Sequence, residues 1–308
     1  MNLVFFGTSS FGLPSLDALK DSNHKLLAVV TQPDKPSGRK LERRASAVKE
    51  WALKKSVPCL DFSRESEEAC VQRLAELKAD VFIVISFGRL LKKNLLEMPK
   101  VVALNVHASL LPRWRGASPM QSAILAGDAE TGVGVMRMVE ALDAGDVLLE
   151  KRLRMEPLES IATLEPKLAV LGASALLNAL DLLQKGSALW KSQDANKATV
   201  CTKIKKEDGR IVWSETADNL DRRVRAFLNW PGSYTFFGEK RLILKRCRAE
   251  AGSGHRSGVV LEAGSSGIRV GTGQGALVLE ELQLEGRNAL SAGEFLKGFP
   301  LKAGDNLH

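Results

Sequence analysis

An asparagine and a histidine stand two residues apart in the segment 105–119, which reads NVHASLLPRWRGASP. Both follow the apolar run VVAL, and side chains two apart in a strand point to the same face. Asn105 and His107 would therefore present an amide and an imidazole side by side at the end of a strand. Such a pair can donate hydrogen bonds to an oxygen that becomes negative during a reaction, although a histidine satisfied within a core fits the same pattern.

A carboxylate could join this pair from the segment 141–147, ALDAGDV. Asp143 and Asp146 stand in an expected turn after an apolar strand. A carboxylate beside His107 would orient the ring and favour its protonated form. Spacing does not decide which aspartate does so, and both residue types are also ordinary turn formers.

Short apolar strands alternate with helices through the first 190 residues. We expect strands at 2–7, 26–31, 81–86, 101–107 and 132–138, and helices near 11–20, 47–55, 64–79, 118–127 and 160–186. This alternation predicts an α/β domain with a Rossmann-like, mostly parallel sheet. Open sheets of this kind bind ligands beyond the carboxyl ends of their strands, where Asn105 and His107 would lie.

The character of the chain changes near residue 190. Residues 191–206 are polar and basic and are expected to form a linker, with residues 32–46 forming a long exposed loop earlier in the chain. Beyond a helix at about 214–228, short apolar segments alternate with glycine-rich turns. We therefore expect a first domain over 1–190 and an OB-like β-barrel domain over 207–308.

The composition is that of a soluble globular protein, with 44% hydrophobic and 26% charged residues among 308. No apolar run approaches the roughly 18 residues that span a bilayer, and no basic leader precedes the first strand. We expect a cytoplasmic protein without a membrane partner. The four cysteines form no CxxC pair, so neither a disulfide framework nor a metal site is expected.

The net charge of +8 is concentrated in two segments. Residues 34–55 carry eight basic and three acidic residues, and residues 203–248 carry twelve basic and six acidic residues. Clustered positive charge favours a polyanionic partner such as nucleic acid, although a solvated basic face gives the same count.

The N-x-H of NVHASLLP, followed by LDAG at 142–145, resembles the 10-formyltetrahydrofolate-dependent formyltransferases. The resemblance implies that Asn105, His107 and Asp143 form the catalytic set, with 10-formyltetrahydrofolate as co-substrate and no metal. It also implies folate contacts from SFGRLL and SLLP, namely Phe87, Gly88, Leu90, Ser109, Leu110, Leu111 and Pro112.

The similarity covers essentially the whole chain and narrows to the branch of the family that acts on aminoacyl-tRNA. VFFGTSSFGLPSL, QPDKPSGRK and KIKKEDGRIVW are the segments that carry it. It implies a formyltransferase for the α-amino group of initiator methionyl-tRNA in translation initiation, which we expect to be a monomer. The expected tRNA contacts are Arg39, Lys40, Arg43, Arg44, Lys203, Lys205 and Lys206.

Two other functions fit part of the pattern. A formyltransferase for a nucleotide-linked amino sugar, or another small amine, would share Asn105, His107 and Asp143 but would not be expected to carry this loop, linker and C-terminal domain. An RNA-binding module with an inactive first domain would not need these three residues. Trp114 fits either a ring that stacks on the substrate or an anchor for its own loop.

Overall fold

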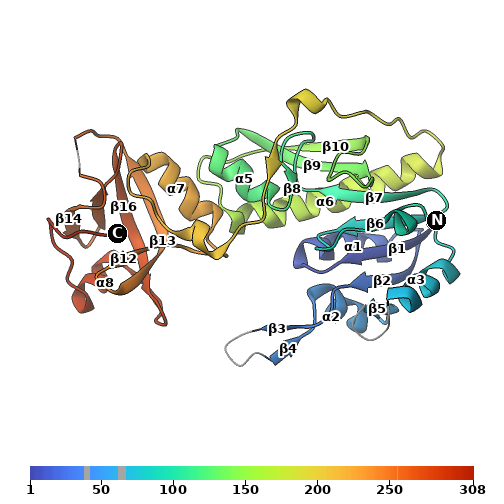
Figure 1. The fold of residues 1–308 in the computed structure, drawn as a ribbon, viewed down its shortest axis with the longest axis horizontal. Helices are drawn as coiled ribbons and strands as arrows, with labels where there is room; N and C mark the ends of the chain where they lie inside the picture. The colour runs from blue at the N-terminus through green and yellow to red at the C-terminus, as the bar shows by residue number, and fades with distance from the viewer. Residues whose placement is uncertain (38–41, 62–66, 255) are drawn as a thin grey trace. The chain divides into compact units, whose positions relative to one another are not determined.

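The computed structural model describes residues 1–37, 42–61, 67–254 and 256–308, which form two compact units (Figure 1). The first unit comprises Met1–Pro119, Glu130–Arg154 and Glu165–Cys201. The second comprises Met120–Ala129, Met155–Leu164 and Thr202–His308. Each unit has its own sheet.

The sheet of the first unit has seven strands in the order β10-β9-β7-β6-β1-β2-β5. In chain order they are β1 (Asn2–Gly7), β2 (Lys25–Thr31), β5 (Cys59–Asp61), β6 (Val81–Ile85), β7 (Val102–His107), β9 (Glu130–Arg137) and β10 (Val147–Arg154). The pairs from β7 to β5 are parallel, whereas β9 and β10 are antiparallel to their neighbours. The expected mostly parallel sheet is confirmed. Strands β5 and β10 were missed, because β5 has three residues and β10 mixes apolar with charged side chains.

Helices pack on both faces of this sheet. They are α1 (Leu13–Lys20), α2 (Ala47–Lys54), α3 (Glu67–Glu76), α4 (Lys93–Leu96) and most of α6 (Ile161–Gln184), with the short 3-10 turn η1 (Ser10–Gly12). Helix α5 (Pro119–Ala126) belongs to the second unit from Met120 onward. Leu74 of α3 and Leu95 of α4 share a buried cluster with Ala103 of β7. Because side chains alternate along a strand, Val106 faces the opposite side, where Gly172 of α6 approaches it.

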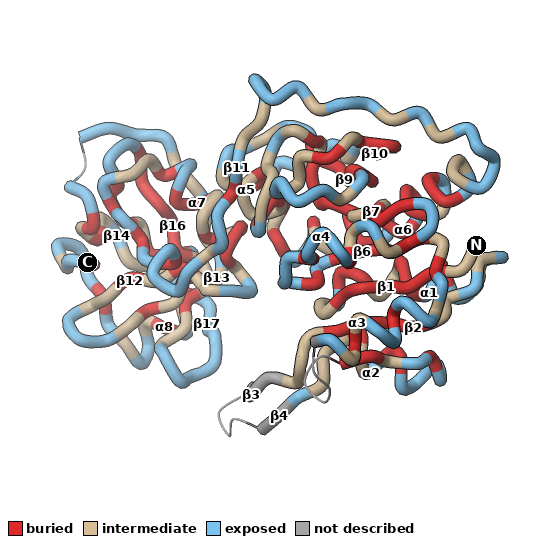
Figure 2. Tube along the Cα trace, turned by 45° about the vertical axis from the view of Figure 1, so that its right-hand side comes forward, coloured by how far each residue is buried: buried red, intermediate tan, exposed pale blue. Residues whose placement is uncertain are grey.

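Helix α6 corrects one expectation from the sequence. Among the described residues it is the one helix that is long and apolar enough to cross a membrane by length and composition. Charged residues near both of its ends hid this apolar stretch in the sequence. Leu168, Leu176 and Leu180 are fully buried against the protein, so α6 is a core helix (Figure 2).

The second unit is an antiparallel β domain, as expected. Its main strands run in the order β12-β13-β16-β15-β14, and β17 pairs with β16. Its elements are η3 (Lys206–Gly209), α7 (Ala217–Ala226), β12 (Ser233–Phe237), β13 (Lys240–Glu250), β14 (Val260–Gly264), β15 (Gly267–Gly271), β16 (Ala276–Leu284), β17 (Ala289–Ser291) and α8 (Ala292–Gly298). Strand β13 lies beside β16 although β14 and β15 separate them in sequence, which is a Greek-key arrangement. Leu220 of α7 and Phe295 of α8 pack into its core.

The segment 32–46, expected as a loop, contains a short hairpin of β3 (Lys35–Ser37) and β4 (Glu42–Arg44). Side chains fix its base. Ser46 caps α2 by accepting from the Lys49 backbone N–H at 3.1 Å, and its hydroxyl lies 2.6 Å from Thr31 Oγ1. Lys49 Nζ lies 2.8 Å from both Asp34 Oδ1 and Asp61 Oδ2. Hydrogen bonds with Asp34 and then Asp61 raise the pKa of Lys49 above its usual value.

We expect Lys49→Met to lower the free energy of unfolding by about 3 kcal/mol, because it leaves two carboxylates beside each other without their cation. A raised lysine pKa stabilises the fold below the unfolded pKa of about 10.4, and this contribution is lost as pH rises through the folded pKa. The wild type should therefore lose more stability above about pH 10.4 than the variant does. Urea unfolding at neutral and alkaline pH measures both effects. Lys54→Met, on the exposed face of α2, is the matched control. An equal loss of stability in both variants would contradict the stabilising role of the Lys49 ion pairs with Asp34 and Asp61.

Candidate active site

The candidate residues lie at the carboxyl ends of adjacent strands in the first unit. Strand β1 has β2 on one side and β6 on the other, so the order of strands reverses there. Open α/β sheets bind ligands in the crevice at such a reversal. Thr8, after β1, donates from Oγ1 to the carbonyl of Phe87, after β6, at 3.0 Å. Strand β7, which ends at His107, is the next strand beyond β6.

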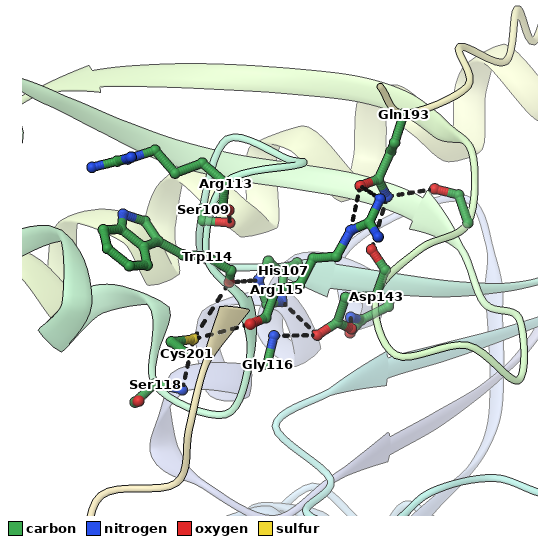
Figure 3. A network of polar contacts seen from close by, with 12 residues as sticks. His107, Ser109, Arg113, Trp114, Arg115, Gly116, Ser118, Asp143, Gln193 and Cys201 are labelled. Atoms are coloured by element: carbon green, nitrogen blue, oxygen red, sulfur yellow. Dashed lines mark hydrogen bonds and ion pairs between the residues drawn. The ribbon is translucent and has the colours of Figure 1, made fainter. Parts of the chain in front are cut away.

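Asn105, His107 and Asp143 come together at this end of the sheet (Figure 3). Asn105 Nδ2 donates to Asp143 Oδ1 at 3.3 Å, and His107 Nδ1 lies 3.7 Å from Asp143 Oδ2. The backbone N–H of Gly116 donates to the same Oδ2 at 2.8 Å. The side chains of His107 and Asp143 are only 7% and 13% exposed. Asp146 faces elsewhere and accepts from the Ser192 hydroxyl at 2.9 Å, so the ring has Asp143 as its carboxylate neighbour.

The tautomer of His107 follows from its second contact. Nε2 lies 2.8 Å from the carbonyl oxygen of Trp114, and because a carbonyl only accepts, Nε2 carries the hydrogen. The sequence led us to expect this ring to donate to a substrate oxygen. In the structure that donor is occupied by the Trp114 carbonyl, while Nδ1 faces the carboxylate.

Trp114 is held through its backbone. Its N–H donates to Thr199 Oγ1 at 2.8 Å, and its backbone has the left-handed φ of 59°. The Arg113 guanidinium lies over the indole ring, 4.4 Å from the ring centre. Figure 3 shows the ring directed away from His107 and Asp143. Of the two roles that the sequence left open for Trp114, these contacts favour an anchor for its own loop over a ring that stacks on the substrate.

Residues 191–201, which we call the strap, run along the loops that carry the site. The strap contains η2 (Ala195–Lys197) and β11 (Val200–Cys201), and β11 pairs in parallel with β8 (Arg115–Gly116). At its start, Lys191 and Val147 exchange backbone hydrogen bonds of 2.8 and 2.9 Å. This part of the expected linker at 191–206 thus belongs to the first unit. Its polar side chains suggested a linker between domains, but side chains such as Gln193 form hydrogen bonds with the loops of the site.

Gly116 is required where the strap crosses the site. A Cβ on this residue would lie 2.1 Å from the carbonyl oxygen of Cys201, and its φ of 116° is one that glycine tolerates best. The Cys201 thiol donates to the Arg115 carbonyl at 3.3 Å and accepts from the Ser118 N–H at 3.4 Å. The pairing of β8 with β11 therefore aims the Gly116 N–H at Asp143.

The residues expected to contact folate divide into buried and exposed groups. Phe87 is buried and packs edge-on against Phe6, 5.5 Å between ring centres, so its backbone alone faces the site. Gly88, with a φ of 76°, and Leu90, 76% exposed, are open to solvent in the same loop.

The SLLP segment is tied mainly to the protein itself. The Ser109 hydroxyl donates to the Arg113 carbonyl at 2.6 Å, and Leu111 is buried with Met136 and Val147. Leu110 and Pro112 are half-buried. Among the described residues, no group of three or more His, Cys, Asp or Glu side chains is arranged to hold a metal ion.

The residues expected to contact tRNA are only partly described. Arg39 and Lys40 lie outside the described residues, and so does the side chain of Arg43. The Arg44 side chain is 75% exposed and lies 3.8 Å from Glu50. In the second unit the three expected lysines, Lys203, Lys205 and Lys206, are exposed.

Pairing with carboxylates reduces the positive charge that the sequence count suggested for the second unit. On α7, Arg223 pairs with Glu215 and Arg225 with Asp221. The arginines of β13 pair in the same way, as Arg241–Glu285, Arg246–Glu280 and Arg248 with both Glu250 and Glu280. The three expected lysines are exposed, as are Arg210, Arg287 and Lys302, and all of these cations are open to an anionic partner.

Comparison with known proteins identifies both halves of the chain. Residues 1–180 match the formyl transferase family, and residues 203–300 match the C-terminal domain of formyl transferases. The chain is similar to the methionyl-tRNA formyltransferase of Geotalea daltonii, 40% identical over 307 residues, covering 100% of this chain and 98% of the relative. It is also similar to that of Legionella pneumophila strain Paris, 42% identical over 297 residues, covering 96% and 95%.

Solved structures share the fold at much lower identity. The sugar 3N-formyl transferase WlaRD, solved with dTDP and 5-N-formyl-THF, has a TM-score of 0.66 at 15% identity, covering 94% of this chain and 99% of that one. HypX of Aquifex aeolicus, solved with tetrahydrofolic acid, has a TM-score of 0.65 at 19% identity, covering 99% and 50%. Both were solved with folates, and at this identity the likeness shows the fold alone.

We expect Gly116→Ala to lower the free energy of unfolding by about 3 kcal/mol or more, because the new methyl group meets the Cys201 carbonyl and the backbone is strained. Gly186→Ala is the matched control. Gly186 also has a positive φ, 66°, but nothing lies within 4 Å of its Cβ position. Strain alone should cost about 1 kcal/mol there. Thermal unfolding of both variants measures the difference, and equal losses would show that the close approach of the strap is unimportant.

Proposed function

The chain belongs to the formyl transferase family, of which it carries both domains, and we propose that 10-formyltetrahydrofolate is its formyl donor. Its activity is that of its full-length relatives, the formylation of methionyl-tRNA. The observation that carries this function is identity of about 40% over essentially the whole chain, which includes the C-terminal domain. Product N-formylmethionyl-tRNA serves translation initiation.

The proposed reaction moves one formyl group between two nitrogens. The neutral α-amine of the methionyl ester attacks the formyl carbon carried on N10 of the folate. A free α-amine has a pKa of about 7.7–8.0, so a useful neutral fraction exists at pH 7. The new N–C bond forms as the formyl oxygen takes up negative charge. The N10–C bond then breaks, the amine proton passes to N10, and tetrahydrofolate leaves.

Asn105 and His107 are the donors we propose for the negative oxygen. Asn105 uses one amide hydrogen on Asp143, which leaves its second for the substrate. His107 holds its Nε2 hydrogen on the Trp114 carbonyl, and we propose that the formyl oxygen replaces this carbonyl when substrate binds. Catalytic hydrogen bonds commonly reach their final geometry only in the substrate complex.

Asp143 has a supporting role in this proposal. Its Oδ2 lies 3.7 Å from His107 Nδ1, where a carboxylate stabilises the imidazolium form of the ring. It can also pass the amine proton onward through a water molecule. The Gly116 N–H holds the carboxylate in place beside the ring.

The two substrates reach this centre from different parts of the chain. We propose that the folate lies along the loops of Phe87–Leu90 and Ser109–Pro112, at the reversal of strand order. The tRNA would be held by the basic hairpin segment that includes Arg44 and by Lys203, Lys205 and Lys206. We propose a catalytic domain ending with the strap, a short connection, and a tRNA-binding domain from about residue 207. We also propose that the protein is a monomer of the cytoplasm.

The decisive assay measures transfer of labelled formyl from 10-formyltetrahydrofolate to initiator methionyl-tRNA. Elongator methionyl-tRNA and a nucleotide-linked amino sugar serve as competing acceptors. We expect rapid transfer to the initiator tRNA and little to the other two. Transfer to the amino sugar alone would support the proposed formyl-transfer chemistry but would show that methionyl-tRNA is not the acceptor.

In the same assay, Asn105→Ala should lower kcat about 10²- to 10³-fold, the usual effect of losing one donor to a negative oxygen. His107→Ala and Asp143→Ala should also lower turnover at saturating substrate. Asp146→Asn is the matched control, because Asp146 lies on the same loop but bonds to Ser192. Turnover near that of the wild type in both His107→Ala and Asp143→Ala would remove the proposed catalytic roles.

Contacts with tRNA phosphates make binding strongly dependent on salt. Each of Lys203→Gln, Lys205→Gln and Lys206→Gln should reduce the slope of log KM for tRNA against log salt by roughly one. Arg248→Gln is the control, because this arginine is already paired with Glu250 and Glu280. A wild-type KM that does not change with salt would contradict the proposed contacts.

A further inference from the structure

Gln193 of the strap connects two loops of the site through four hydrogen bonds. Its Oε1 accepts from Arg115 Nε at 2.9 Å and from Arg115 Nη2 at 2.8 Å. Its Nε2 donates to the carbonyls of Asp143 at 2.8 Å and Gly145 at 2.7 Å. Both amide hydrogens and both oxygen lone pairs are thus used. The orientation of the amide is fixed, because the reverse would place oxygen against two carbonyls and NH₂ against a guanidinium.

These bonds act on the turn that carries the carboxylate. Asp143 has a φ of 46°, a left-handed conformation that a non-glycine residue holds only when its surroundings impose it. Gln193 binds the carbonyl of that residue and the carbonyl two residues later. Arg115, at the other end of the amide, precedes Gly116, whose N–H bonds the Asp143 carboxylate. One side chain therefore holds both the backbone of Asp143 and the loop that supplies its hydrogen-bond donor.

We infer that Gln193 is a positioning residue for formyl transfer, which sets the distance between the Asp143 carboxylate and the His107 ring. This inference rests on the proposed function only for its kinetic consequence. Gln193 is only half-buried, and no substrate atom needs to touch it. Its effect passes through Asp143, so removing Asp143 must remove the effect.

Two substitutions separate the halves of the amide. Gln193→Glu keeps an oxygen for Arg115 but turns the donor side into an oxygen that faces two carbonyls. Gln193→Met is neutral and similar in length, and it loses all four bonds. We expect each to lower kcat about 100-fold, the effect of misplacing a catalytic group by about 1 Å, with the KM for tRNA little changed. In an Asp143→Ala background, neither should lower kcat further.

Ser192→Ala is the matched control. Ser192 is the neighbour of Gln193 in the strap, and its hydroxyl bonds the side chain of Asp146 on the same turn. Its hydrogen bond to this turn is made to Asp146 and not to Asp143, which carries the carboxylate beside His107. This variant should keep the kcat of the wild type.

A second measurement needs no substrate. The ¹H and ¹⁵N resonances of the His107 ring are recorded by NMR at one pH in the wild type, Gln193→Met and Ser192→Ala. In Gln193→Met the ring resonances should move, because a displaced Asp143 carboxylate changes the electric field at Nδ1. Ser192→Ala should leave the ring resonances unchanged. Thermal unfolding of each variant confirms that the protein is folded.

The outcomes distinguish this inference from the proposed function. Ring resonances that do not move in Gln193→Met, or kcat losses that multiply in the Asp143→Ala background, would overturn the positioning role. If the resonances move in Gln193→Met but the wild-type protein fails to formylate methionyl-tRNA, the proposed function is wrong and the positioning role stands.

Discussion

The arrangement of the site depends on one constraint, the placement of a nearly buried carboxylate beside a histidine. Removing an ionised carboxylate from water is costly unless donors replace the water. Asp143 receives these donors from two places, the amide of Asn105 and the backbone N–H of Gly116, and the His107 ring lies beside it with Nδ1 at 3.7 Å. None of these partners is a lysine or arginine. The charge is therefore held by dipoles and by a ring that can itself become charged, which keeps the electrostatics of His107 sensitive to small movements of Asp143.

Most elements around the site can be understood as supports for that placement. Strand β7 sets Asn105 and His107 on one face, but Asp143 and Gly116 come from loops that have no regular structure of their own to fix them. The strap supplies what is missing, since β11 pairs with β8 and Thr199 bonds the N–H of Trp114. Residues separated by about 85 positions in sequence thus share one small hydrogen-bonded network. Groups on loops are held less precisely than groups on strands or helices, and the strap compensates by bonding these loops to a second segment.

The sequence predicts the parts of this structure that depend on local pattern. The apolar runs identify the central strands, and alternation places Asn105 and His107 together. The resemblance selects Asp143 over Asp146, and Asp143 is the aspartate that lies beside His107. The strap could not be found this way, because Gln193 and Thr199 are ordinary polar residues whose partners are distant in sequence. Charge counting does not show which cations are paired, for a related reason. The arginines of β13 look like a basic stretch, but their carboxylate partners lie mainly on the neighbouring strand β16.

Backbone strain explains why several hydrogen bonds hold Trp114 and Asp143. Trp114 and Asp143 both adopt left-handed conformations, which cost of order 1–3 kcal/mol each in strained regions of this kind, and both bear directly on His107. Relaxing either residue would move an acceptor away from one of the two ring nitrogens. The ring is therefore held between a carbonyl and a carboxylate that are themselves maintained by surrounding hydrogen bonds. A substrate oxygen that takes the place of the Trp114 carbonyl would meet the His107 Nε2–H, which already points to that position. Little reorganisation would then remain for the chemical step.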